Sequence, residues 1–295
     1  MKIKVAVLTD IHGNSVALEA ALKDAKKYNI DEFIICGDLV NDFPCSNEVI
    51  DTLKNLTPNI IKGNREQYLI EYDKHKYDWK NIQFKNTLFL YNQLTKENLE
   101  FVKKLPTTLK LKYEDITFRI VHGNMHAING LVYIEDEEAK KECVKELDED
   151  VVILGHTHQY AWVDRVNNKT IINAGCIGIA PKESPEAEYI ILNINGKDLD
   201  VEIKKVKYSL DELKRKIVES GILEYDTAFM NLDLLTITGK ADIARSFYFE
   251  AIDLMKEKNK KLYQDEAEGI FKDFRLYDDD IWQSLTKKYE KYFLI

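Results

Sequence analysis

Apolar and polar residues repeat with two different periods along the N-terminal part of the chain. Short apolar runs at residues 4–8, 32–36 and 59–62 have the length of buried strands. Between them, residues 16–28 and 46–56 place apolar side chains every three or four positions, which is typical of amphipathic helices. Strands that alternate with helices predict a parallel sheet in which the helices form the crossovers.

After a polar and mostly helical segment at residues 74–105, closed by Pro106, the apolar period changes to two. The pattern predicts strands at residues 108–113, 116–121, 151–154, 160–166, 169–172, 189–194 and 201–207, and a helix at 137–147. Short polar links such as Asn167-Asn168 and Asn195-Gly196 favour hairpin turns between neighbouring strands. The second half of the core is therefore predicted to be a largely antiparallel sheet.

The C-terminal part of the chain is predicted to be helical. Ser209 and Glu212 have the spacing of a capping box, and Gly221 suits the position after a last helical turn. The predicted organisation is a core at residues 1–222 followed by a helical appendage at 223–295. The appendage carries aromatic residues that could stack on a nucleobase, although helical spacing favours core packing or an oligomer contact. They are Tyr225, Phe229, Phe247, Tyr248 and Phe249.

Composition excludes several classes of protein. The net charge of −9 argues against a protein that binds long nucleic acid through its phosphates. No apolar run reaches the ~18 residues of a membrane span, and the N-terminus lacks the pattern of a signal peptide. Four cysteines without a Cys-x-x-Cys pair fit a reducing compartment. We therefore expect a soluble, cytoplasmic protein that has no membrane contact.

Seven side chains that can bind a metal ion follow the predicted strands, at the edge where open α/β sheets bind their ligands. They are Asp10 and His12 in Asp-Ile-His-Gly-Asn, Asp38 in Gly-Asp, Asn64 in Gly-Asn-Arg, His122 in His-Gly-Asn, and His156 and His158 in Gly-His-Thr-His. Each motif alone is more often a helix cap or a turn, because short motifs recur by chance. Their conjunction in five segments predicts a metal site.

The donor types narrow the choice of metal. Imidazole and carboxylate without thiolate suit Mn²⁺, our first expectation, and also Fe, Zn, Co or Ni. Seven ligands are too many for one ion, but they divide between two divalent ions if one carboxylate bridges them. Two such ions would supply the positive charge that an anionic substrate needs in an acidic protein.

The order of these motifs resembles the calcineurin-like metallophosphoesterase superfamily over residues 1–207. The resemblance implies a four-layer α/β/β/α sandwich of two mixed sheets, here with a C-terminal helical appendage. By the same resemblance, the first metal would be bound by Asp10, His12 and His158, the bridge would be Asp38, and the second metal would be bound by Asn64, His122 and His156. The motif glycines Gly13, Gly37, Gly63, Gly123 and Gly155 would let the backbone turn tightly beside these ligands.

One position departs from the family pattern. The Gly-Asn motif often continues with a histidine that helps to protonate the leaving group, but Arg65 stands there. Arginine cannot give up a proton at neutral pH, although its planar donors can hold phosphate oxygens. We predict that Arg65 stabilises charge and acts in catalysis with Asp38, Asn64 and His122. His126 is a candidate general acid, with a surface or core position as the alternative.

The resemblance implies hydrolysis of phosphoesters by a hydroxide that bridges two metal ions. Without an obvious acid, phosphodiesters, aryl phosphates and phosphoanhydrides are favoured because their leaving groups are good. The opening motif and the helical tail resemble a subgroup of bacterial phosphodiesterases and dinucleoside-polyphosphate hydrolases, so a small phosphorylated or nucleotide substrate is expected. A phosphomonoesterase or protein phosphatase of the same superfamily and a non-catalytic scaffold are the alternatives. A homo-oligomer through the C-terminal helices is a further expectation.

Overall fold

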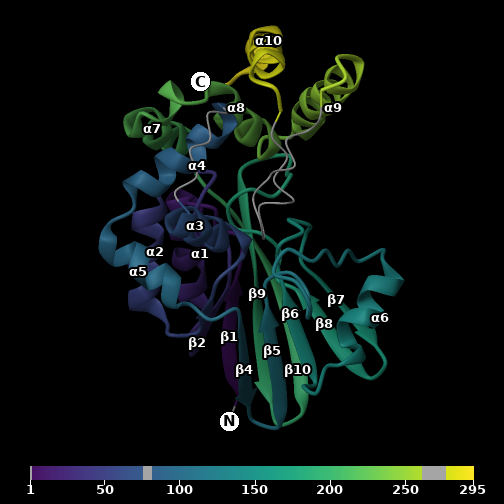
Figure 1. Cartoon of the computed structure of the whole chain (residues 1–295). Helices are drawn as coiled ribbons and strands as arrows, with labels where there is room; N and C mark the ends of the chain where they lie inside the picture. The colour runs from purple at the N-terminus through teal and green to yellow at the C-terminus, as the bar shows by residue number, and fades with distance from the viewer. Residues whose placement is uncertain (1, 76–81, 261–276) are drawn as a thin grey trace.

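The computed structural model describes residues 2–75, 82–260 and 277–295, which form two packed sheets flanked by helices (Figure 1). The strands are β1 (Ile3–Leu8), β2 (Glu32–Cys36), β3 (Ile60–Ile61), β4 (Thr108–Tyr113), β5 (Ile116–Val121), β6 (Val151–Leu154), β7 (Trp162–Val166), β8 (Lys169–Asn173), β9 (Glu186–Asn195) and β10 (Asp198–Lys207). The helices are α1 (Ser15–Ala25), α2 (Ser46–Leu56), α3 (Asn64–His75), α4 (Ile82–Gln93), α5 (Lys96–Lys104), α6 (Glu137–Lys145), α7 (Leu210–Ser220), α8 (Thr227–Thr236), α9 (Ala241–Glu257) and α10 (Asp279–Tyr289).

The two sheets have five strands each and are covered by helices on their outer faces. Their strand orders are β10-β9-β1-β2-β3 and β4-β5-β6-β8-β7. In β1, Val5 and Val7 pack between the sheets, whereas Ala6 and Leu8 pack toward α1 and α2. Successive side chains of a strand point to opposite faces, so an apolar strand must be covered on both. With α6 on the outer face of the second sheet, the four-layer α/β/β/α sandwich of two mixed sheets is confirmed (Figure 1).

The strand directions in the second half differ from the prediction. β6 pairs in parallel with both β5 and β8, and the β9-β10 hairpin joins the first sheet, where β9 runs antiparallel to β1. The hairpins β4-β5, β7-β8 and β9-β10 are antiparallel as predicted, but the second half does not form one largely antiparallel sheet. Parallel pairing of β5 with β6 is possible because α6 forms the crossover between them. The strand β9 is buried on both faces, which suits a position inside the sheet rather than at its edge.

Most other helices and strands begin and end close to the predicted residues. The strand predicted at 59–62 shortens to two residues, and the helix predicted to end at residue 28 ends at Ala25, with a 3₁₀ turn after it. The helix α3, which the pattern missed, begins at Asn64. The helical segment predicted at 74–105 corresponds to α4 and α5, and residues 76–81 within it lie outside the described part of the chain.

The helices α7 to α10 lie at the end of the sandwich opposite the N-terminus (Figure 1). Ser209 caps α7 by accepting a hydrogen bond from the Glu212 amide at 3.2 Å, and Gly221 ends the helix with a left-handed φ of 79°, both as predicted. Phe247 is buried among these helices, whereas Phe249 is 63% exposed. The boundary at residue 222 and an oligomer contact through the appendage both stay predictions.

Two observations bear on the environment of the protein. All four cysteines are buried and free. Among the described residues, none of the helices is both long enough and apolar enough to cross a membrane. A cytoplasmic location stays a prediction.

Candidate metal centre

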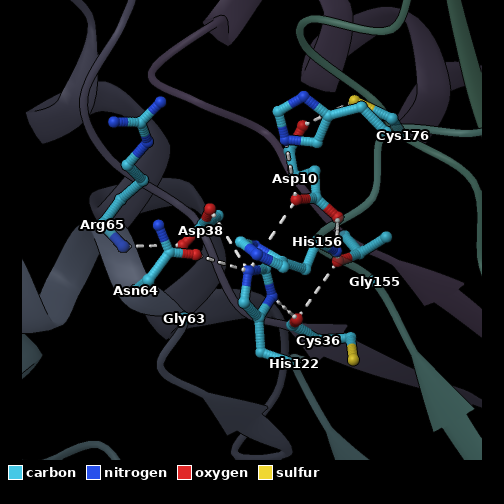
Figure 2. Close-up of polar contacts among 12 residues, drawn as sticks. Asp10, Cys36, Asp38, Gly63, Asn64, Arg65, His122, Gly155, His156 and Cys176 are labelled. Atoms are coloured by element: carbon cyan, nitrogen blue, oxygen red, sulfur yellow. Dashed lines mark hydrogen bonds and ion pairs between the residues drawn. The ribbon is translucent and has the colours of Figure 1, made fainter. Parts of the chain in front are cut away.

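The predicted ligands that follow β1, β2, β5 and β6 converge on one place, although some are 146 residues apart in the sequence. Figure 2 shows the side chains of Asp10, Asp38, Asn64, His122 and His156 directed toward one another. They divide into two groups by the distances between their donor atoms.

The first group contains the four donors Asp10, His12, Asp38 and His158, whose ligand atoms all lie within 4.8 Å of one another. The Nε2 atoms of His12 and His158 are 2.9 Å apart. Asp10 Oδ1 lies 3.2 Å from His158 Nε2 and 3.5 Å from His12 Nε2. Two carboxylates and two imidazoles therefore face a common point.

The second group contains Asp38, His122 and His156. His122 Nε2 lies 3.2 Å from Asp38 Oδ2 and 3.1 Å from the side-chain oxygen of Asn64. Asp38 belongs to both groups, as a bridging carboxylate must. The structure thus brings all seven predicted ligands together in two adjoining sets.

Two buried carboxylate oxygens lack a hydrogen-bond donor within these sets. Asp10 Oδ1 and Asp38 Oδ2 accept no hydrogen bond from the described residues, although both side chains are almost fully buried. A buried anionic oxygen without a donor is costly unless a cation compensates it. Oxygen and imidazole nitrogen are also the donors that divalent transition metals accept, so the residues fit such ions.

The backbone at the centre is strained. Five predicted ligands have the left-handed φ that non-glycine residues rarely adopt: Asp10 (53°), His12 (52°), Asp38 (51°), His156 (68°) and His158 (52°). Each such residue costs on the order of 1–3 kcal/mol and persists only where the surrounding structure holds it. Strain concentrated on these residues indicates that the chain gives up stability to direct their side chains inward.

Two ligands are oriented by partners on their far ring nitrogens. His12 Nδ1 lies 2.5 Å from Asp42 Oδ2, and His122 Nδ1 lies 2.7 Å from the Cys36 carbonyl oxygen. These contacts leave the Nε2 atoms facing the centre, which is the usual arrangement of metal-binding histidines. Asp42 was not among the residues predicted from the sequence, where its one signal was a carboxylate four residues after Asp38.

Glu66 is a second residue of the centre that was not predicted from the sequence. Its buried carboxylate accepts hydrogen bonds from the amides of Asp38 (2.9 Å), Leu39 (2.7 Å), Val40 (3.1 Å) and Gly63 (2.6 Å). It therefore ties the loop that carries Asp38 to the loop that precedes Asn64. Burial and the nearby Asp38 charge raise the pKa of Glu66 to about 7, against the opposing effect of its amide donors.

The motif glycines serve two different needs. Gly13 and Gly37 have positive φ, as tight turns require. At Gly63 and Gly155 the requirement is space, because an added Cβ would lie 2.1 Å from Asp38 Oδ1 and 2.6 Å from Asp10 Oδ2, respectively. Larger residues there would displace the two carboxylates.

Arg65 and His126 differ in their relation to the centre. The Arg65 amide donates to Asp38 Oδ1 at 2.8 Å, while its guanidinium points away from Asn64 and His122 (Figure 2). One guanidinium nitrogen lies 3.2 Å from Asp42 Oδ1, so this arginine is paired already. His126 is a surface residue, 46% exposed and 3.7 Å from Glu142.

The charges and the burial at the centre raise the pKa of two histidines and lower the pKa of a third. Burial opposes protonation of His12, but Asp42, Asp10 and Asp38 outweigh it and raise its pKa to about 10. The same balance between burial and the Asp38 and Asp10 carboxylates raises the pKa of His122 to about 9. Burial and the neighbouring His122 lower the pKa of His156 to about 4.

These shifts predict how the stability of metal-free protein depends on pH. Below pH 6.5 the protons on His12 and His122 stabilise the fold fully, and this contribution is lost as the pH rises through 9 to 10. The unfolding temperature in the presence of chelator is therefore expected to fall from pH 6.5 to pH 10, as circular dichroism would record. The surface variant His126→Gln should show the same slope. A flat or rising profile in this window would contradict the prediction.

Comparison with known proteins points to one family. Residues 3–197 match the family model of the calcineurin-like phosphoesterase superfamily domain. An uncharacterized protein of Methanocaldococcus jannaschii is 24% identical over 243 residues, which cover 76% of this chain and 96% of that protein.

Two solved structures share the fold. A metallophosphoesterase from Sphaerobacter thermophilus is 24% identical with a TM-score of 0.61, over 74% of this chain and 95% of its own. A hypothetical protein from Pyrococcus horikoshii OT3 is 19% identical with a TM-score of 0.68, over 81% of this chain and 99% of its own. The family match ends before α7, so the C-terminal helices lie outside it.

Proposed function

The chain belongs to the calcineurin-like phosphoesterase superfamily, and we propose that it hydrolyses phosphodiester or phosphoanhydride bonds with the help of two divalent metal ions. Family membership makes it a metal-dependent phosphoric ester hydrolase. The observation that carries the proposal is the position of Asp38, which belongs to both groups of ligand atoms. The substrate we propose is a small phosphorylated compound or nucleotide.

The residues divide naturally between two ions. Asp10, His12 and His158 would hold the first ion, and Asn64, His122 and His156 would hold the second, with Asp38 between them. When bound, the two cations would lower the pKa of water and neutralise charge on the phosphoryl oxygens. We propose Mn²⁺ for both sites, since the donor set lacks thiolate and is rich in imidazole and oxygen.

The residues around the ligands favour substrates with good leaving groups. Arg65 keeps its proton, because its pKa is raised further by the Asp42 and Asp38 carboxylates, which outweigh the effect of burial. His126 lies on the surface and is paired with Glu142. Among the side chains that the structure describes, no histidine besides the predicted ligands lies at the centre to protonate an alkoxide, so we expect a leaving group that departs as a stable anion, as phosphates and aryl oxides do.

The test is hydrolysis of three substrates by metal-stripped protein while Mn²⁺ is added back in steps. Bis-p-nitrophenyl phosphate represents diesters, p-nitrophenyl phosphate represents monoesters, and diadenosine tetraphosphate represents anhydrides. We expect turnover that depends on Mn²⁺ and is faster with the diester or the anhydride than with the monoester. Faster monoester hydrolysis would favour a phosphomonoesterase, and no turnover with any divalent metal would favour a scaffold.

A further inference from the structure

Thr9 is a polar residue that continues a series of inward-facing apolar residues. Val5 and Val7 of β1 belong to the buried cluster between the two sheets, and the alternation of the strand extends this series to Thr9. Thr9 is fully buried. A valine would suit such a position, because a buried hydroxyl group is unfavourable unless it forms hydrogen bonds. The partners of the Thr9 hydroxyl group therefore decide what it does.

The hydroxyl group of Thr9 has two acceptors within reach. Its Oγ1 atom lies 2.7 Å from Asp10 Oδ2 and 3.1 Å from the Cys36 carbonyl oxygen. A hydroxyl group has one proton to donate, and a hydrogen bond to a charged carboxylate is shorter and stronger than one to a neutral oxygen. The proton is therefore directed to Asp10, a predicted ligand of the first metal ion.

The two carboxylate oxygens of Asp10 have different surroundings as a result. Oδ2 accepts from the Thr9 hydroxyl group and also from the His156 amide, at 3.0 Å. Oδ1 has no donor among the described residues and lies 3.2 Å from His158 Nε2 and 3.5 Å from His12 Nε2. Two donors on one oxygen fix the rotation of the carboxylate and leave the other oxygen for a cation.

Close packing keeps the Thr9 hydroxyl group in this place. Gly155 follows β6 of the other sheet, and an added Cβ there would lie 2.2 Å from Thr9 Oγ1. The Gly155 amide is held in turn by the His122 carbonyl oxygen, at 2.9 Å. Thr9 thus contacts both Asp10 and the start of the loop that carries His156, so its hydroxyl group has little freedom to turn elsewhere.

Stability of the fold alone does not account for this hydroxyl group. Without it, Asp10 Oδ2 would still accept from the His156 amide. The Cys36 carbonyl oxygen would still accept from His122 Nδ1, at 2.7 Å. Neither acceptor would lose its last donor, so removal of the hydroxyl group should cost the fold little. The loss would fall on the orientation of the Asp10 carboxylate.

We propose that Thr9 is a positioning residue for the first metal ion, because its hydroxyl group holds the Asp10 carboxylate with Oδ1 directed to the site of the ion. This role rests on the two-metal centre of the proposed function and involves no contact between Thr9 and the substrate. Removal of a partner that orients a metal ligand typically weakens metal binding by about 10–100-fold. The lower end is expected here, since the His156 amide would still hold Oδ2.

Two variants separate the hydroxyl group from the shape of the side chain. Thr9→Val keeps the shape without the hydroxyl group, and Thr9→Ser keeps the hydroxyl group. In calorimetric titration of metal-stripped protein with Mn²⁺, we expect Thr9→Val to bind one of two ions about tenfold more weakly than wild type and Thr9→Ser to stay within about threefold. Hydrolysis of bis-p-nitrophenyl phosphate by Thr9→Val should need about tenfold more Mn²⁺, and excess Mn²⁺ should restore most of the activity.

Thr57→Val is the matched control. Thr57 is also a buried threonine, but it precedes β3 and its hydroxyl group donates to the Phe33 carbonyl oxygen at 2.8 Å, so this variant should bind Mn²⁺ like the wild type. Wild-type Mn²⁺ affinity in Thr9→Val, or equal weakening in Thr9→Val and Thr9→Ser, would overturn the role of the hydroxyl group. An unfolding temperature of metal-free Thr9→Val below that of Thr57→Val would overturn it in favour of a structural role.

Calorimetry also separates this role from the proposed function. Wild-type protein that binds two Mn²⁺ ions but hydrolyses none of the three substrates would overturn the proposed function alone, because the affinities of the Thr9 variants could still be compared. Wild-type protein that binds fewer than two divalent ions would overturn the two-metal centre and the role of Thr9 with it.

Discussion

Replacement of Asp38 by Asn is expected to reduce turnover of bis-p-nitrophenyl phosphate by about 10³-fold or more while the protein stays folded. Asp38 is the one carboxylate that both ligand groups share, and its Oδ2 has no donor among the described residues. An asparagine keeps the shape, and its amide oxygen can still accept from the Arg65 amide, which now donates to Asp38 Oδ1 at 2.8 Å. It removes the negative charge that two cations would share.

His156→Ala is expected to abolish turnover for a related reason, since it removes one donor from the second group. Asp51→Asn is the matched control, because Asp51 is an exposed acid on α2 that pairs with Lys54 at the surface. Unfolding curves of all three variants should resemble the wild type, and bound Mn²⁺ should be lower for the first two by elemental analysis. Near wild-type activity of Asp38→Asn or His156→Ala would refute the assignment of the metal centre.

Replacement of Glu66 by Ala is expected to destabilise the protein by about 3–5 kcal/mol and to abolish metal binding. The substitution would leave the four buried amides that now donate to Glu66 without acceptors. Those amides belong to the two loops that hold Asp38 and Asn64, so both ligands would lose their positions. Urea unfolding at pH 8 and Mn²⁺ binding measure the two effects separately.

Glu66→Gln is the matched variant for this site. Its amide oxygen can accept from two of the four donors, but its NH₂ group would face the other two. We expect a smaller loss of stability than in the alanine variant and weaker, measurable Mn²⁺ binding. Wild-type stability of Glu66→Ala would show that the loops hold their shape without this carboxylate.

The periodic pattern of apolar and polar residues along the chain determined most of the local structure. β2 and α2 have the predicted bounds, because strand and helix periods are properties of neighbouring side chains. Ser209 and Gly221 end α7 as predicted, since capping depends on a few adjacent residues. The positions of the ligands were also readable, because each one directly follows a buried strand and stands in a short motif.

Tertiary structure alone decided how these segments combine. The hairpin β9-β10 was visible in the sequence, but its place beside β1 follows from the burial of both faces of β9, which only the assembled sandwich provides. The roles of Asp42 and Glu66 depend on partners up to 30 residues away, so no local pattern marks them. Arg65 was predicted to stabilise charge in catalysis, and the sequence did not indicate its pairing with Asp42 in the fold, because charge pairs depend on distance in space rather than along the chain.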